Sequence, residues 1–101
     1  MTTGVIGILG GGQLGRMLAL AGHNLALTTR CYDTAADAVA GHVTQLHVDS
    51  FEQPERLDQF LSGVTAVTYE FENVPVALAE RINATVPCYP PPAALRAAQD
   101  R

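Results

Sequence analysis

The fold of this chain is decided near its start by the stretch Val5-Ile6-Gly7-Ile8-Leu9-Gly10-Gly11-Gly12-Gln13-Leu14-Gly15-Arg16-Met17. A β-rich apolar run breaks into three glycines and resumes with helical periodicity, which predicts a strand, a tight turn and a helix beginning near Gln13. The glycines at 10, 12 and 15 fit G-x-G-x-x-G, in which they allow the turn, the approach of a ligand and close helix packing, respectively. Because the N-terminus of such a helix has free N–H groups and a positive dipole end, we expect an anion, most simply a phosphate, over the turn.

The glycine pattern is also compatible with other sites. The spacing of Gly10 and Gly15 also suits a P-loop, but Arg16 stands where that motif needs lysine, and Met17 has no hydroxyl for magnesium. Asp33 lies 18 residues after Gly15, near the spacing at which dinucleotide-binding domains place the acid that holds a ribose. An NAD(P)-binding Rossmann module of a dehydrogenase or regulator is therefore the alternative, and a purely structural turn is a third interpretation.

Length, composition and net charge limit the class of protein. The 101 residues make one domain with an ordinary globular composition, 48% hydrophobic and 16% charged. The net charge is −4 and the chain has no basic cluster, so we expect no binding to nucleic acid. The apolar runs are far shorter than the roughly 20 residues that span a bilayer, and no secretory signal opens the chain, so we expect no membrane partner. Cys31 and Cys88 have no metal or CxxC spacing, so they are predicted to be buried free thiols of a protein in a reducing cytoplasm.

Strands and helices are predicted to alternate along the chain. The strands after the first are expected at 25–29, about 44–48, 64–69 and 86–89, and the helices at 13–21, about 53–61, about 74–83 with Asn73 as N-cap, and from 93 onward. This order predicts an α/β fold, a Rossmann-like three-layer open parallel sheet of about five strands with helices on both faces. Ligands bind such sheets beyond the carboxyl ends of the strands, which collects the glycine turn, Asp33 and residues 70–73 on one edge.

Apolar residues at helical spacing mark one side of each predicted helix. In the first helix, which Gly22 is expected to end, the spacing is i, i+3, i+4 and i+7. The residues concerned are Leu14, Met17, Leu18 and Ala21 in the first helix, Leu57, Phe60 and Leu61 in the second, and Leu78 and Ile82 in the third.

Three motifs in order carry a resemblance to a known family: residues 10–17, the segment Thr68-Tyr69-Glu70-Phe71-Glu72-Asn73-Val74-Pro75, and Ala94-Leu95-Arg96-Ala97-Ala98-Gln99-Asp100-Arg101. Together they closely resemble the N-terminal domain of 5-(carboxyamino)imidazole ribonucleotide synthetase, the ATPase subunit of phosphoribosylaminoimidazole carboxylase, in the ATP-grasp superfamily. The resemblance covers essentially the whole chain. It implies that residues 1–101 are a single pre-ATP-grasp domain, the N-terminal fragment of a longer enzyme.

The resemblance implies a function in purine biosynthesis. Members of this family use ATP and bicarbonate to carboxylate the exocyclic amine of 5-aminoimidazole ribonucleotide by way of carboxyphosphate. The chain would then be the substrate-side domain of an ATP-dependent carbon–nitrogen ligase, inactive by itself. ATP and Mg²⁺ would be bound mostly by the remaining ATP-grasp domains of the same chain, and the intact enzyme would be a homodimer.

The same resemblance assigns binding residues but no catalytic ones. The ribonucleotide would be held by Gly11, Gly12, Gln13, Leu14, Gly15, Glu70 and Glu72. Glu70, the first acid of a Glu-x-Glu motif, would accept hydrogen bonds from ribose hydroxyls or the amine, whereas the side to which Glu72 points stays open. Arg96 would lie near the ATP phosphates, and its guanidinium suits this place because it is permanently charged and can donate two hydrogen bonds to phosphate oxygens. Arg16 is either a phosphate ligand or a solvated surface charge.

No metal site or nucleophile is predicted. His23, His42 and His47 lack metal-ligand spacing and are expected at a helix end, in a loop and on a strand face. The chain contains no lysine, so a lysine nucleophile or Schiff base is excluded within these residues. A stand-alone scaffold or interaction protein remains a further hypothesis, which the unfinished last helix makes less attractive.

Overall fold

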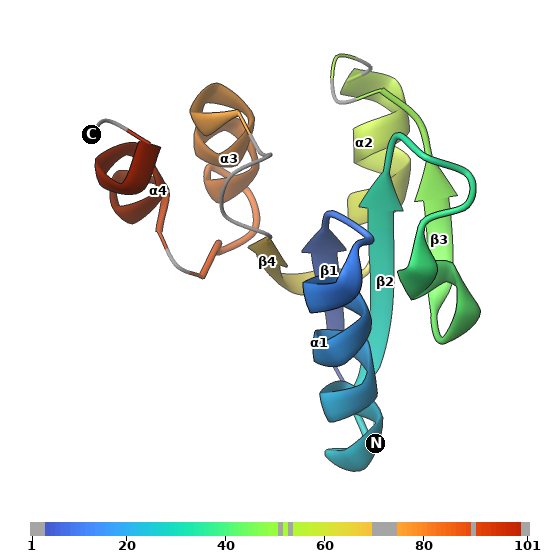
Figure 1. The fold of residues 1–101 in the computed structure, drawn as a ribbon. Coiled ribbons are helices and arrows are strands. Elements are labelled where there is room, and N and C mark those ends of the chain that lie inside the picture. The colour runs from blue at the N-terminus through green and yellow to red at the C-terminus, as the bar shows by residue number, and fades with distance from the viewer. Residues whose placement is uncertain (1–3, 51, 53, 70–74, 90, 100–101) are drawn as a thin grey trace.

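The computed structural model describes residues 4–50, 52, 54–69, 75–89 and 91–99 (Figure 1). Strands and helices alternate as predicted. The elements are β1 (Val5–Leu9), α1 (Gln13–Asn24), β2 (Thr28–Asp33), the 3₁₀ helix η1 (Val39–His42), β3 (Gln45–Val48), α2 (Pro54–Leu61), β4 (Val64–Tyr69), α3 (Val76–Asn83) and α4 (Pro92–Gln99).

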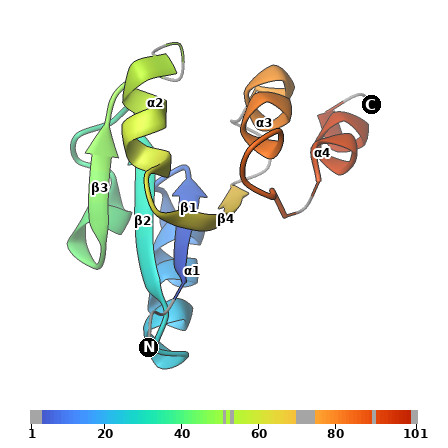
Figure 2. The ribbon, with the colours of Figure 1, turned by 180° about the vertical axis from the view of Figure 1, so that it is seen from behind.

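The four strands form one parallel sheet in the order β3-β2-β1-β4, with helices on both faces. Helix α1 lies on the face seen in Figure 1, and α2 lies on the opposite face, which Figure 2 shows from behind. Because side chains alternate along a strand, Ile8 and Cys31 are buried on the α1 face while Leu9 and Tyr32 are buried on the α2 face. The predicted three-layer α/β architecture is confirmed.

Helix α1 packs on the sheet through its smallest residues. Gly15, Ala19 and Gly22, spaced by four and three residues, are the buried positions of this helix. A Cβ atom on Gly22 would stand 2.8 Å from the Cγ2 atom of Thr29, so only glycine allows the helix to come this close to β2. The prediction that Gly22 ends the helix is wrong, because this glycine serves packing and α1 continues to Asn24.

The large apolar residues of α1 lie mostly on its exposed side. Leu14 is 47% exposed and Met17 is 62% exposed, and Ala21 is exposed as well. Only Leu18 of the predicted stripe packs against the core. The apolar periodicity therefore identified the helix correctly but did not mark the side that faces the sheet.

Strand β2 begins later than predicted. The expected strand at 25–29 is wrong, because residues 25–27 form the turn that leaves α1 and β2 runs from Thr28 to Asp33. The amides of Leu25 and Leu27 both donate to the carbonyl of Gly22, at 3.0 and 2.8 Å, and Ala26 takes a positive φ of 58°. A short apolar run was mistaken for a strand where the chain reverses.

The last predicted strand is reduced to a single bridge. Within the described residues Cys88 pairs with Val67 of β4 in parallel, and no longer ladder forms there. The Val67 amide donates to the Pro87 carbonyl at 2.9 Å, and the Tyr89 amide donates to the Val67 carbonyl at 2.8 Å. Pro87 has no N–H to extend the ladder, which explains why about five strands become four and a bridge.

The inner sides of α2 and α3 are as predicted. Leu57 and Phe60 of α2 are buried, as are Leu78 and Ile82 of α3. Pro75 is the N-cap of α3, whereas the predicted cap Asn73 lies outside the described residues.

Both cysteines are free and buried, as expected from their spacing. Burial raises the pKa of the Cys88 thiol, which lowers the share of reactive thiolate at neutral pH. None of the helices in the described part of the chain is long and apolar enough to cross a membrane.

Arg30 joins β2 to the C-terminal end of α2. Its Nη1 atom donates to the carbonyls of Phe60 and Ser62, at 2.6 and 2.8 Å. These carbonyls belong to the end of a helix, where acceptors lack intrahelical partners and a cation is favourable.

We therefore expect Arg30→Met to lower the free energy of unfolding by about 1–2 kcal/mol, because charge-assisted hydrogen bonds to α2 are lost. Urea denaturation measures the change. Arg81→Met is the control, since the side chain of Arg81 makes an exposed ion pair with Asp58 at 3.9 Å, which contributes little to stability. Equal effects of the two substitutions would contradict the assignment.

Candidate functional site

The parallel sheet brings the glycine turn and the end of β2 to one edge. Leu9 pairs with Tyr32 of β2 and with Tyr69 of β4, so Gly10, which follows β1, and Asp33, which ends β2, lie at the carboxyl ends of neighbouring strands (Figure 1). This part of the sequence prediction is confirmed. The predicted ligands Glu70 and Glu72 lie outside the described residues.

The glycine turn leads directly into α1. Gly10 has a φ of 103°, a conformation that favours glycine, and its amide donates to the Tyr32 carbonyl at 2.8 Å. Gly12 is the N-cap residue of α1, and no side chain caps the helix. The amides of Gly12, Gln13 and Leu14 have no hydrogen-bond acceptor among the residues that the structure describes. Three N–H groups are thus available to a ligand at this helix end.

The first turn of α1 carries no acidic residue, and its side chains differ in exposure. Gln13 and Leu14 are exposed, whereas Gly15 is buried against the sheet. Arg16 is half-buried one turn into the helix, so both interpretations of its role stay open. The helix itself therefore places no carboxylate at its positive dipole end, and its free N–H groups favour an anion there.

Asp33 holds the glycine loop instead of facing an open groove. Its Oδ2 atom accepts a hydrogen bond from the Gly11 amide at 2.6 Å, and its Oδ1 atom accepts one from the Ala35 amide at 2.9 Å. Both carboxylate oxygens therefore have partners within the chain. This use differs from the binding of ribose hydroxyls, which the dinucleotide alternative required of the same residue.

The segment after β2 covers Gly11. The Ala40 amide donates to the Gly11 carbonyl at 2.9 Å, and a Cβ atom on Gly11 would stand 2.9 Å from the Cβ atom of Ala38. Gly11 is consequently buried, with its amide and carbonyl both bonded to the chain. Of the loop residues predicted to approach a ligand, Gly12 and Gln13 are more accessible than Gly11.

Arg96 lies on α4, away from the glycine turn, beside α3 (Figure 1). Its Nη2 atom is 2.7 Å from Glu80 Oε1, and the two side chains are 60% and 52% exposed. An exposed ion pair of this kind contributes little to stability and exchanges readily. The pair therefore leaves the guanidinium able to turn to another anion.

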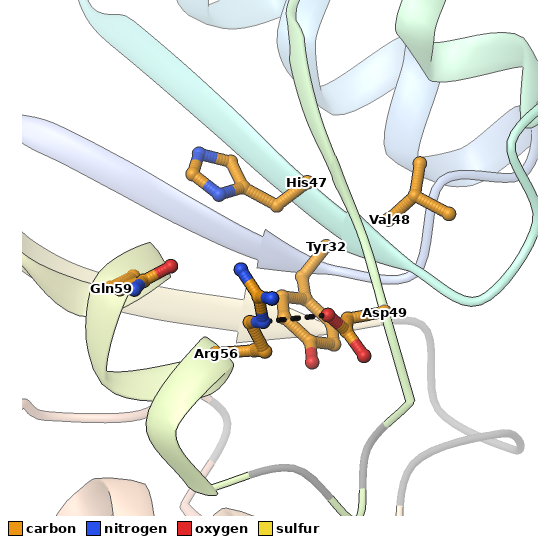
Figure 3. A pocket seen from close by; sticks show the side chains of 6 residues that line it. All are labelled: Tyr32, His47, Val48, Asp49, Arg56 and Gln59. Carbon is orange, nitrogen blue, oxygen red and sulfur yellow. Dashed lines mark ion pairs between the residues drawn. The ribbon is translucent and has the colours of Figure 1, made fainter.

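A small polar cleft lies on the α2 face of the sheet, between β3 and α2 (Figure 3). It measures about 80 Å³ and is lined by Tyr32, His47, Val48, Asp49, Arg56 and Gln59. Arg56 Nε and Asp49 Oδ2 are 3.3 Å apart, and the Tyr32 hydroxyl donates to the Ser50 carbonyl at 2.5 Å. Burial and then the charge of Asp49 raise the pKa of Tyr32, so its hydroxyl stays protonated. No motif in the sequence marked this cleft.

His47 has a buried nitrogen in this cleft. Its Nε2 atom has no hydrogen-bond partner among the described residues, and its ring meets that of Phe60 edge-on at 5.5 Å. Burial, and secondarily the charge of Arg30, lower the pKa of His47 below 6.5. The imidazole is thus held neutral in the folded protein.

Stability should consequently depend on pH through His47. It is fully present above the unfolded-state pKa of 6.5 and is lost as the pH falls from there toward the lowered folded-state pKa, because the unfolded chain takes up the proton first. Urea denaturation at pH 7.5 and 5.5 should show a loss, with this residue adding less than about 1.4 kcal/mol per pH unit. His47→Gln should reduce the loss, and His42→Gln, at an exposed position, should not. A loss unchanged in His47→Gln would refute this.

His23 and His47 lie at a helix end and in a strand, as predicted, whereas His42, expected in a loop, lies in a 3₁₀ helix. His23 is in the last turn of α1, His42 ends η1 and His47 is in β3. In the described part of the chain, no three residues of the metal-ligating types His, Cys, Asp and Glu come together. Among the described residues, the backbone amides at the start of α1 are therefore the candidate groups for binding an anion.

A glycine turn that opens a helix at the carboxyl edge of a parallel sheet defines a Rossmann-like domain, and here the acid at the end of β2, Asp33, bonds to the glycine loop itself. Residues 1–99 match the family described as ribonucleotide synthetase preATP-grasp domain, and the chain belongs to this family. This membership and the bonds of Asp33 disfavour the dinucleotide-binding alternative.

Relatives with known names support the same assignment. The chain is 42% identical over 97 residues to N5-carboxyaminoimidazole ribonucleotide synthase of Brucella melitensis, covering 95% of this chain and 27% of that protein. It is similar to the crystal structure of the corresponding synthetase from Thermus thermophilus, with 54% identity, a TM-score of 0.89, and 93% and 26% of the two chains covered. The Aspergillus clavatus synthase in complex with ADP and 5-aminoimidazole ribonucleotide shares 30% identity at a TM-score of 0.79, with 93% and 26% covered. The chain thus spans about a quarter of the length of these proteins.

Proposed function

We propose that this chain is the substrate-side domain of an ATP-dependent carbon–nitrogen ligase that carboxylates 5-aminoimidazole ribonucleotide with bicarbonate in purine biosynthesis. The observation that carries the proposal is the helix end at Gly12, Gln13 and Leu14, whose amides have no acceptor in the described chain. Three N–H groups without acceptors at one helix end and the dipole of α1 suit a phosphate group. The Aspergillus clavatus relative, crystallised with ADP and this ribonucleotide, supports the choice of substrate.

In this proposal the ribonucleotide is held from two sides. The loop over Gly11 to Gly15 lies against it, with the amides of Gly12, Gln13 and Leu14 donating to the phosphate and the side chain of Gln13 able to donate and accept hydrogen bonds. Glu70, one residue beyond the end of β4, accepts from a ribose hydroxyl or the amine, and Glu72 supports it. Since β4 pairs with β1, the sheet favours this meeting of the loop and the acid.

ATP and Mg²⁺ are proposed to bind mainly outside this chain, within further ATP-grasp domains of an intact, homodimeric and cytoplasmic enzyme. ATP supplies the phosphoryl group that activates bicarbonate when it is bound. Arg96 is the residue of this chain proposed to reach its phosphates, exchanging the exposed Glu80 carboxylate for them. The chain alone, a single domain over residues 1–101, should not turn over.

In the intact enzyme, Glu70→Gln should raise KM for the ribonucleotide about tenfold or more, because a charged acceptor of hydrogen bonds is lost. KM for ATP should change little. Steady-state kinetics with each substrate varied in turn measures both. Glu55→Gln, which neutralises an exposed carboxylate on α2, is the matched control. Unchanged kinetic constants in Glu70→Gln would remove this residue from the site.

Calorimetric titration of the 101-residue chain separates this function from the dinucleotide alternative. We expect tight binding of neither NADH nor ATP, since the Asp33 carboxylate already has two partners in the loop. Micromolar binding of NADH that Asp33→Ala abolishes would support a dinucleotide-binding module instead.

A further inference from the structure

We propose that Asp33 is a positioning residue for the ribonucleotide site, acting through the glycine loop and without touching the substrate. Its carboxylate would hold Gly11 so that the next amides, from Gly12 to Leu14, point at one place. This inference rests on the proposed function, because it assumes that those amides bind the substrate.

The contacts of Asp33 fix the loop to the sheet. Asp33 is the last residue of β2, and its own carbonyl accepts from the Asp49 amide at 3.1 Å, so its backbone is anchored beside β3. From this anchor the Oδ2 atom reaches the Gly11 amide at 2.6 Å, a distance short enough for a charge-assisted hydrogen bond. The Ala35 amide, at 2.9 Å from Oδ1, sets the rotation of the carboxylate.

Within the described residues, the loop is held at Gly10 and Gly11, whereas the amides from Gly12 to Leu14 have no acceptor. The Gly10 amide is bonded to Tyr32, the Gly11 amide to Asp33, and the Gly11 carbonyl to the Ala40 amide at 2.9 Å. The following N–H groups have no acceptor in the described chain. Asp33 and Ala40 bond to the amide and the carbonyl of Gly11, so the free amides that follow are oriented before the substrate binds. Such preorganisation improves binding because less conformational entropy of the loop is lost.

Because the Asp33 carboxylate lies close to the proposed anion site, the direction in which its neutralisation changes substrate affinity tests this role. If Asp33 were only a nearby negative charge, neutralising it would strengthen binding of the phosphorylated substrate. If it positions the loop, neutralisation weakens binding, because Asn offers one acceptor oxygen for two N–H groups and turns an NH₂ group toward a donor. The two interpretations predict opposite changes in the same quantity.

The experiment compares Asp33→Asn with Asp37→Asn in the intact enzyme. Asp37 is an exposed acid of the same connection, so both variants lose one negative charge from the same region. We expect Asp33→Asn to raise KM for the ribonucleotide about tenfold or more, with KM for ATP within about twofold of wild type. Asp37→Asn should leave the ribonucleotide KM unchanged or slightly lower. Thermal melting of each variant verifies that it is folded.

A ribonucleotide KM at or below the wild-type value in folded Asp33→Asn overturns the positioning role. A parallel rise of both KM values overturns it too, since that indicates a general loss of structure. Asp33→Glu keeps the charge but lengthens the side chain, so it should raise the ribonucleotide KM by less than Asp33→Asn does. If Asp33→Asn does not fold, Asp33→Glu replaces it in the test, and a ribonucleotide KM at or below the wild-type value overturns the positioning role. If Glu70→Gln raises this KM while the Asp33 variants do not, only the positioning role fails; if neither has an effect, the proposed function fails.

Discussion

The parallel pairing of β1 with β2 on one side and β4 on the other is the constraint on which the site depends. It brings the carboxyl ends of three strands to one edge of the sheet, where the glycine turn follows β1, Asp33 ends β2 and Tyr69 ends β4. Backbone amides at a helix end bind an anion only where the sheet directs them, and here the sheet directs them beside the end of β4. A different strand order would separate these groups although every residue of the sequence stayed the same.

The second constraint is the close approach of α1 to the sheet. Gly15, Ala19 and Gly22 form its buried side, and a methyl group at Gly22 would collide with Thr29. The helix therefore lies near enough to the sheet for its first turn to follow β1 without a longer loop. The larger apolar side chains were the more conspicuous pattern in the sequence, yet the close contact selects the smallest residues and turns Leu14 and Met17 outward. Hydrophobic periodicity reports burial on average and does not report how near two elements come.

The role of Asp33 illustrates how one spacing serves two chemistries. An acid some twenty residues beyond the glycines is expected to bind a ribose in a dinucleotide-binding domain. In this fold the connection through Ala38 and Ala40 lies against Gly11, and the acid turns to the Gly11 amide. The spacing predicted that Asp33 would reach the end of β2, which is correct, but not which donor it would meet there. The small cleft around His47 likewise had no signal, because its residues come from separate elements that only packing brings together.

By itself the sequence determined the alternation of strands and helices, the glycine turn, the burial of both cysteines and the inner sides of α2 and α3. These features follow from local conformational preference and from periodicity within a single element. The tertiary structure alone decided where β2 begins, which side of α1 meets the sheet, that the last strand shrinks to a bridge at Cys88, and that the Asp33 carboxylate binds the loop. Each of these depends on contacts between residues far apart in the chain, whose distances and orientations no local pattern specifies.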